Sequence, residues 1–140
     1  PSEWFGSFTS YQASIGISAL KNVQSFDAKR IHHAHKVMKI ASTMKFGQRK
    51  NKHDHTYWQL VTYANNPSAV IEMLRANGVD SCTSSLELIS GLSDYPGSQA
   101  MPNALKIHTR AIFIPCFARL SEHQKQKIYN AMAEIKNIFV

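Results

Sequence analysis

Histidines are the side chains of this protein whose type and spacing could do chemistry. Five of the seven gather in two places, the cluster His32, His33 and His35 and the triplet His53-Asp54-His55. A zinc site needs three or four ligands that converge from one face. On a helix, His32 and His35 share a face while His33 points about 100° away, and no cysteine lies nearby. We therefore expect exposed helix surface rather than a metal site.

The triplet could supply a general acid and a general base, but nothing with the local setting of a nucleophile accompanies it. The sequence has no Gly-x-Ser-x-Gly elbow and no phosphate-binding glycine loop. Cys82 and Cys116 fit small buried hydrophobes better than reactive thiols. We predict no catalytic, cofactor-binding or metal-ligating residue in this chain.

Composition limits the class of protein. The chain has 140 residues, of which 44% are hydrophobic, and this describes one globular domain with its own core. The longest apolar stretch, Ala111 to Cys116, is far shorter than the roughly 18 residues of a membrane span. Two cysteines make no disulfide scaffold, so we expect a cytoplasmic location. Because Pro1 is neither an initiator methionine nor the start of a signal peptide, we expect a piece of a longer protein.

Basic residues outnumber acidic ones, 16 to 9, and give a formal net charge of +7. The densest basic run, Lys45 to His53, contains Gly47 and is predicted to be an exposed loop. One hypothesis is that Lys45 to Lys52 make the chain a non-catalytic basic binding module for anionic partners. No zinc-finger, helix-turn-helix or RNA-recognition signature accompanies the charge, so nucleic acid is not the expected partner.

Residues 1–44 are predicted to be a helical lead-in, with helices over 9–22 and 25–44. Ser25 is the expected N-cap of the second helix. Apolar residues recur at helical spacing and are expected to face the core; they include Leu20, Val23, Ile31, Ala34 and Met38.

Residues 56–140 are predicted to fold as an α/β sandwich. Aromatic and β-branched content predicts strands over 56–64 and 110–117 and a weaker one over 79–85. Cap signals predict helices from Pro67 to Asn77-Gly78, from Pro102 to His108, and from Ser121 to about Ile138. The fold class is therefore α+β, a small, mostly antiparallel three-stranded sheet with helices packed on it.

Five short motifs follow one another along the chain. They are Ser10-Tyr11-Gln12-Ala13-Ser14-Ile15-Gly16-Ile17-Ser18-Ala19-Leu20, Tyr57-Trp58 to Tyr63, Asn77-Gly78-Val79-Asp80, Met101-Pro102-Asn103-Ala104, and Ile112-Phe113-Ile114-Pro115 with Leu120-Ser121. In this order they resemble the C-terminal part of the DegT/DnrJ/EryC1 sugar aminotransferases, fold-type-I enzymes that use pyridoxal phosphate (PLP). The resemblance covers about residues 8 to 138.

The resemblance implies that residues 1–140 are a single domain, the small C-terminal domain of a larger enzyme. Its implied partners are a missing N-terminal large domain and a second subunit in a homodimer. The implied parent transaminates a nucleotide-linked keto sugar in surface polysaccharide biosynthesis, with PLP on a Schiff-base lysine of the large domain. None of the eleven lysines here lies in that motif, so the fragment is expected to bind no cofactor and to be inactive alone.

Two departures from the family pattern give the candidate site residues. Family members usually carry Asn-x-Arg where this chain has Gly6-Ser7-Phe8, and a histidine where it has Thr83-Ser84-Ser85. Both changes remove groups that would bind an anionic cofactor or substrate at the dimer interface. The candidates for the substrate pocket or interface are Gly6, Ser7, Phe8, Ser84 and Ser85. The parent is then either a divergent enzyme with an altered substrate or one that has lost transamination.

Aromatic residues crowd the start of the chain, namely Trp4, Phe5, Phe8 and Tyr11. One interpretation is that they cover this domain's own core. The other is that they contact the missing large domain or a second subunit, because interfaces favour aromatic residues. In that case the fragment is expected to self-associate through this aromatic edge.

Overall fold

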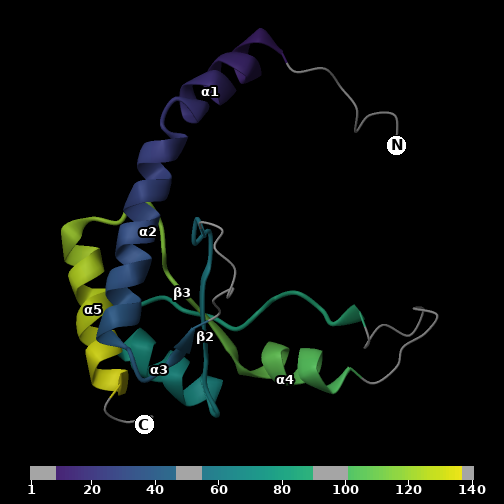
Figure 1. Ribbon diagram of the computed structural model, residues 1–140, viewed down its shortest axis with the longest axis vertical. Helices are drawn as coiled ribbons and strands as arrows, with labels where there is room; N and C mark the ends of the chain where they lie inside the picture. The colour runs from purple at the N-terminus through teal and green to yellow at the C-terminus, as the bar shows by residue number, and fades with distance from the viewer. Residues whose placement is uncertain (1–8, 47–54, 90–100, 137–140) are drawn as a thin grey trace.

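The computed structural model describes residues 9–46, 55–89 and 101–136. Within these ranges the helices are α1 (Ser10–Leu20), α2 (Val23–Ile40), α3 (Pro67–Ala76), α4 (Pro102–Arg110) and α5 (Glu122–Lys136). The strands are β1 (Lys45–Phe46), β2 (Leu60–Tyr63) and β3 (Ala111–Ile114). Figure 1 shows α2, α3 and α5 gathered beside the sheet, while α1 and α4 project from this body. The predicted α+β class is confirmed.

The sheet is antiparallel, with β2 between β1 and β3. Leu60 pairs with Ile114 and Tyr63 pairs with Ala111. Burial alternates along β2, since Leu60 and Thr62 are buried and their neighbours half-buried, as expected for a strand with one face on the core. The Thr62 hydroxyl donates to the Lys45 carbonyl over 2.9 Å, so this buried polar group is satisfied inside the sheet.

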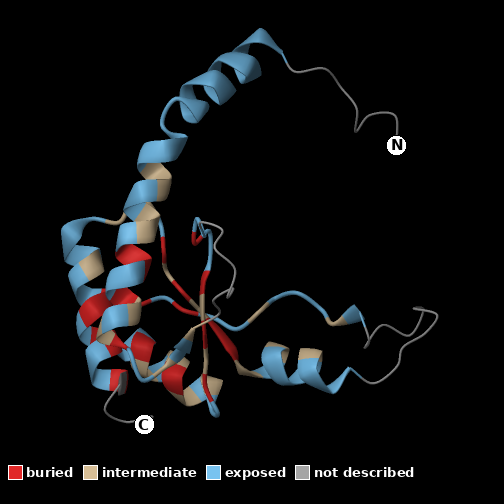
Figure 2. Cartoon of the chain, in the orientation of Figure 1, coloured by how far each residue is buried: buried red, intermediate tan, exposed pale blue. Residues whose placement is uncertain are grey.

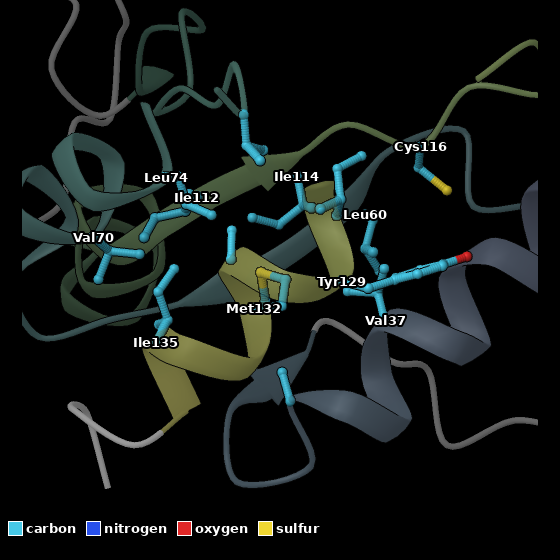
Figure 3. Close-up of a cluster of buried hydrophobic side chains, with 14 of the residues drawn as sticks. Val37, Leu60, Val70, Leu74, Ile112, Ile114, Cys116, Tyr129, Met132 and Ile135 are labelled. Carbon is cyan, nitrogen blue, oxygen red and sulfur yellow. The ribbon is translucent and has the colours of Figure 1, made fainter. Parts of the chain in front are cut away.

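One hydrophobic core joins the sheet to three helices. Helix α5 packs against both α2 and α3, and α3 also contacts β3. Figure 3 shows buried side chains of this core from α2, β2, α3, β3 and α5: Val37, Leu60, Val70, Leu74, Ile112, Ile114, Tyr129, Met132 and Ile135. The inward-facing residues predicted for α5 (Ile128, Met132 and Ile135) are confirmed as buried.

Helix α1 takes no part in this core. It contains no buried residue, and in Figure 2 the whole helix has the colour of exposed residues. Leu20 is 69% exposed and Val23, the first residue of α2, is 43% exposed. The prediction that these two residues face the core of this domain is therefore wrong.

The sequence predicts three strands, but the third one is elsewhere. The segment 79–85 makes only one isolated bridge, between Cys82 and Phe113, because its serine and threonine side chains offer little apolar surface. The third strand is instead β1, which pairs with β2 at the opposite edge of the sheet and lies at the start of the run predicted to be a loop. This segment forms a strand because the Phe46 side chain packs against the core.

Helix ends follow local signals with one exception. Asn66 accepts from the Ala69 amide over 3.2 Å, and Ser121 and Gln124 form the predicted reciprocal capping box. Gly78 has φ +72° and ends α3, as Val79 N–H donates to the Leu74 carbonyl. The exception is α2, predicted over 25–44: Ser25 is not its N-cap, because the helix already begins at Val23, and it ends at Ile40, four residues before the predicted end.

Two leucine-to-alanine variants can test how much α1 and the core each contribute to the free energy of unfolding. Leu74→Ala should lower the free energy of unfolding by about 2–5 kcal/mol, because it leaves a cavity in the core. Leu20→Ala should change it by less than about 0.5 kcal/mol in this chain, because Leu20 is exposed. Urea denaturation of both variants tests this, and equal losses would contradict the position of α1.

Candidate functional site

Of the five candidate residues, Gly6, Ser7 and Phe8 lie outside the described residues, as do Trp4 and Phe5 of the aromatic edge. The same holds for residues 47–54, so Lys45 is the one basic side chain of the binding run that is described, and it is exposed in β1. Tyr11 is 76% exposed and covers no core within the described structure. Ser84 and Ser85 are described and lie in a segment between α3 and α4.

This segment, residues 82–89, is held at two points. The Phe113 amide donates to the Cys82 carbonyl over 2.8 Å, which ties one end to β3. Further along, His108 Nε2 of α4 lies 2.7 Å from the Leu86 carbonyl oxygen. Since a carbonyl only accepts, Nε2 of His108 carries the proton in this contact. In Figure 1 the segment and α4 extend from the sheet on the same side.

The two candidate serines have different roles in this segment. The Ser84 hydroxyl oxygen accepts from the Leu86 amide over 3.1 Å, so it shapes a local turn. Ser85 is exposed and presents its side chain to whatever lies against the segment. Ser81, which directly precedes the 82–89 segment, is 4% exposed, and its hydroxyl has no hydrogen-bond partner within the described residues. Of these three hydroxyl groups, only that of Ser85 is exposed to a partner outside the described residues, because that of Ser81 is buried and that of Ser84 is already used in the turn.

The prediction that the first histidine cluster is helix surface is wrong for His33. His33 is 1% exposed; its Nε2 lies 3.2 Å from the Pro115 carbonyl oxygen and its Nδ1 3.0 Å from the Tyr129 hydroxyl. Nε2 therefore donates to Pro115, and Nδ1 accepts from Tyr129. Burial lowers the pKa of His33, while the bond to Pro115 opposes this shift. Neutral His33 joins α2 to α5 and to the end of β3.

Two further histidines contact one tyrosine rather than a metal. Tyr57 has φ +48°, a conformation that costs energy in an aromatic residue. The His55 ring stacks on it with centroids 4.4 Å apart, and His55 Nδ1 accepts from the Tyr57 amide. His35 Nε2 lies 3.3 Å from the Tyr57 hydroxyl. Within the described residues, no three histidine, cysteine or acidic side chains are placed to hold a metal ion.

A shallow hollow of about 600 Å³ runs along α2. It is lined by His32, His35, Lys36, Lys39 and Ile40. The two lysines of this lining carry positive charge and could bind an anion. None of the lysines whose side chains are described is buried, whereas a Schiff-base lysine is activated in a desolvated pocket. The described residues therefore do not by themselves fit PLP.

The cysteines differ from each other. Cys116 is 3% exposed, and burial raises the pKa of its thiol to about 11. It is the unreactive, buried residue that the sequence predicts. Cys82 is exposed, so the same prediction is wrong for this residue. Its position beside β3 and its polar neighbours explain the difference, because the single bridge to Phe113 leaves its side chain outside the core.

Comparison with known proteins places this domain in a family. The family model of the DegT/DnrJ/EryC1/StrS aminotransferases matches residues 6–133. The chain belongs to this family. A comparison with curated proteins gave no significant match. The family match agrees with the motif order along the chain and covers the 82–89 segment, α4 and β3 together.

Solved aminotransferase structures share the fold. A DegT/DnrJ/EryC1/StrS aminotransferase from Brucella abortus has a TM-score of 0.76 at 17% identity, over 89% of this chain and 35% of its own. DesV from S. venezuelae has a TM-score of 0.80 at 15% identity, over 89% and 36%. PseC from Helicobacter pylori has a TM-score of 0.75 at 18% identity, over 91% and 37%. The chain thus spans little more than a third of the length of these structures.

Sequence reasoning missed His108 and Ser81. The signal for His108 was present, because α4 is amphipathic and its last turn carries His108 and Arg110. Ser81 carries no such signal, since burial of a serine depends on distant elements.

No helix in the described ranges is long and apolar enough to span a membrane.

The pH dependence of stability should report on His33. Its pKa in the folded protein lies below the ordinary value of 6.5, so the unfolded chain binds more protons just below that pH. The free energy of unfolding should therefore be fully retained above pH 6.5 and fall as the pH drops from 6.5 toward the lowered pKa. Lys125 and His32 strengthen this shift and Glu122 weakens it.

The measurement is urea denaturation at several pH values between about 5 and 7.5, the range in which histidine titrates. His33→Gln, which stays uncharged, should lose most of the slope. His123→Gln, at an exposed position of α5, should keep it. A slope that persists in His33→Gln would show that another group causes it.

Proposed function

We propose that this chain is the small C-terminal domain of a PLP-dependent aminotransferase that transaminates a nucleotide-linked keto sugar in surface polysaccharide biosynthesis. The observation that carries the proposal is the family match over residues 6–133. In addition, the chain covers only about a third of the length of each solved aminotransferase. In this proposal residues 1–140 are one domain, and a large domain elsewhere in the parent completes the enzyme.

The sugar substrate is supported by the neighbours in fold. Solved structures similar to this chain include proteins described as sugar aminotransferases, and PseC is described as an aminotransferase involved in the biosynthesis of pseudoaminic acid. A nucleotide-linked sugar presents many hydroxyl groups and a diphosphate. The exposed Ser85 hydroxyl suits such a substrate as a hydrogen-bonding partner, so Ser85 would form part of the pocket wall.

The cofactor and its lysine are assigned to the rest of the parent. No lysine whose side chain is described is buried, so PLP would bind against the large domain, where it would act as the electron sink of transamination. This fragment would position substrate and complete a homodimer interface. Its two thiols are unpaired, as expected for a protein of the reducing cytoplasm.

The cofactor assignment is tested by titrating the full-length protein with PLP. A visible absorbance band of protein-bound PLP should appear, and amino transfer from an amino acid to a nucleotide-linked keto sugar should depend on it. The 140-residue chain should show no such band, because none of its described lysines is buried. A full-length protein without the band would reject the proposed enzyme and favour the alternative, a parent protein that has lost transamination.

The role of Ser85 is tested by adding bulk at its position. Ser85→Trp should raise the KM for the sugar substrate about tenfold, an effect of about 1.4 kcal/mol, while kcat changes less. Ser68→Trp, at an exposed position of α3, is the matched control and should leave both constants unchanged. Steady-state kinetics of the full-length enzyme measures both, and an unchanged KM in Ser85→Trp would remove Ser85 from the pocket wall.

A further inference from the structure

Residues 82–89, which carry both candidate serines, contain no buried side chain. Each residue of this segment is exposed or half-buried, and the Leu86 side chain is 76% exposed. Helix α4, which contacts the segment through His108, contains no buried residue either. Burial of apolar surface therefore does not fix Ser85 in the described structure, and hydrogen bonds must hold the segment in place.

Strand β3 fixes the start of the segment and the end of α4 at separate points. The Phe113 amide of β3 donates to the Cys82 carbonyl over 2.8 Å. Helix α4 ends at Arg110 and β3 begins at the next residue, Ala111, as Figure 1 shows. The Arg110 carbonyl also accepts from the Ala64 amide over 3.0 Å. The last turn of α4 is thus held to the sheet, as is the start of the segment.

His108 closes a ring between these two parts. It lies in the last turn of α4, and its Nε2 donates to the Leu86 carbonyl over 2.7 Å. The Leu86 amide donates to the Ser84 hydroxyl over 3.1 Å. Both polar backbone groups of Leu86 are therefore engaged, and Ser85 is the middle residue of the turn that these bonds hold.

We propose that His108 is a positioning residue of the substrate pocket, which fixes the Leu86 carbonyl and thereby presents the Ser85 hydroxyl to the keto sugar. The inference rests on the proposed function, because it takes Ser85 as part of the pocket wall. His108 itself touches no substrate and acts only through the segment. It strengthens sugar binding because a hydroxyl that is already held in place loses less conformational entropy when the substrate binds.

The two substrates of amino transfer should respond differently to loss of this contact. The keto sugar carries the hydroxyl groups that Ser85 would bind, whereas the amino acid donor carries no sugar hydroxyl. A positioning role of His108 therefore affects the KM for the sugar and leaves the KM for the donor unchanged. General damage to the fold would change both constants, so the comparison separates the two causes.

The test compares His108→Ala with His108→Gln by steady-state kinetics of the full-length enzyme. His108→Ala should raise the KM for the sugar about three- to tenfold, the effect of one lost hydrogen bond, and change kcat and the donor KM by less than about twofold. His108→Gln keeps an N–H donor and should recover most of the KM. His123→Ala, at an exposed position of α5, is the matched control and should change neither constant.

Two kinetic results would overturn the proposal. One is an unchanged KM for the sugar in His108→Ala. The other is an equal rise in the donor KM, which would indicate a general structural role.

A double-mutant cycle tests whether His108 acts through Ser85. Ser85→Ala removes the hydroxyl, so adding His108→Ala to it should raise the KM for the sugar by less than about twofold further. If the two effects multiply, His108 acts through another group and the proposal is wrong.

Hydrogen exchange in the full-length protein measures the positioning itself and needs no activity. Amides of residues 84–89 should exchange about three- to tenfold faster in His108→Ala than in the unsubstituted protein, and His108→Gln should restore the slower rate. Equal rates in His108→Ala and the unsubstituted protein would contradict the role of His108.

Failure of the proposed function has a separate signature, which is a full-length protein without PLP absorbance or amino transfer. In that protein, isothermal titration with a nucleotide-linked sugar replaces the kinetics. A Kd that rises about three- to tenfold in His108→Ala would retain the role of His108 in sugar binding while the enzyme is rejected. An unchanged Kd would overturn the inference as well.

Discussion

The packing of α5 is the interaction on which the rest of the structure depends. A three-stranded sheet with strands of two to four residues is too small to be stable without a layer against it. Helix α5 supplies that layer and at the same time contacts α2 and α3. Its buried face, which includes Ile128, Met132 and Ile135, thus joins segments that lie a hundred residues apart in the chain.

Polar contacts fix the arrangement that hydrophobic burial favours. The His33 imidazole joins α2 to Tyr129 of α5 and to Pro115 after β3, and Lys36 of α2 lies 4.3 Å from the centre of the Tyr129 ring. Apolar surfaces alone tolerate sliding between helices, because the hydrophobic effect has no direction. A buried donor and acceptor pair has direction, so it sets the register of α2 against α5.

The sequence predicts the features that depend on neighbouring residues. The caps at Asn66 and Ser121, and the end of α3 at Gly78, depend on residues within one helical turn, and all are confirmed. The choice of third strand could not be predicted in this way, because a strand is selected by its partner across the sheet. Burial of His33 was missed for the same reason, since its partners lie more than 80 residues further along the chain.

For the candidate site, the motif order led to the correct family, and the segment carrying Ser84 and Ser85 was found by comparison with the family pattern. That His108 lies against this segment depends on how α4 meets residues 82–89, which no local pattern specifies. The roles of all five candidates, Gly6, Ser7, Phe8, Ser84 and Ser85, remain predictions.

The junction at Lys21-Asn22 marks the edge of the unit that folds around α5. Residues 10–20 contribute no buried side chain to the core, so the chain could be divided at this point without opening a cavity. The domain is in this sense modular, because a different helix could be joined before Val23 while the sheet and its three covering helices stay intact. Recombination between related genes at this position would exchange α1 and preserve the α5-centred core.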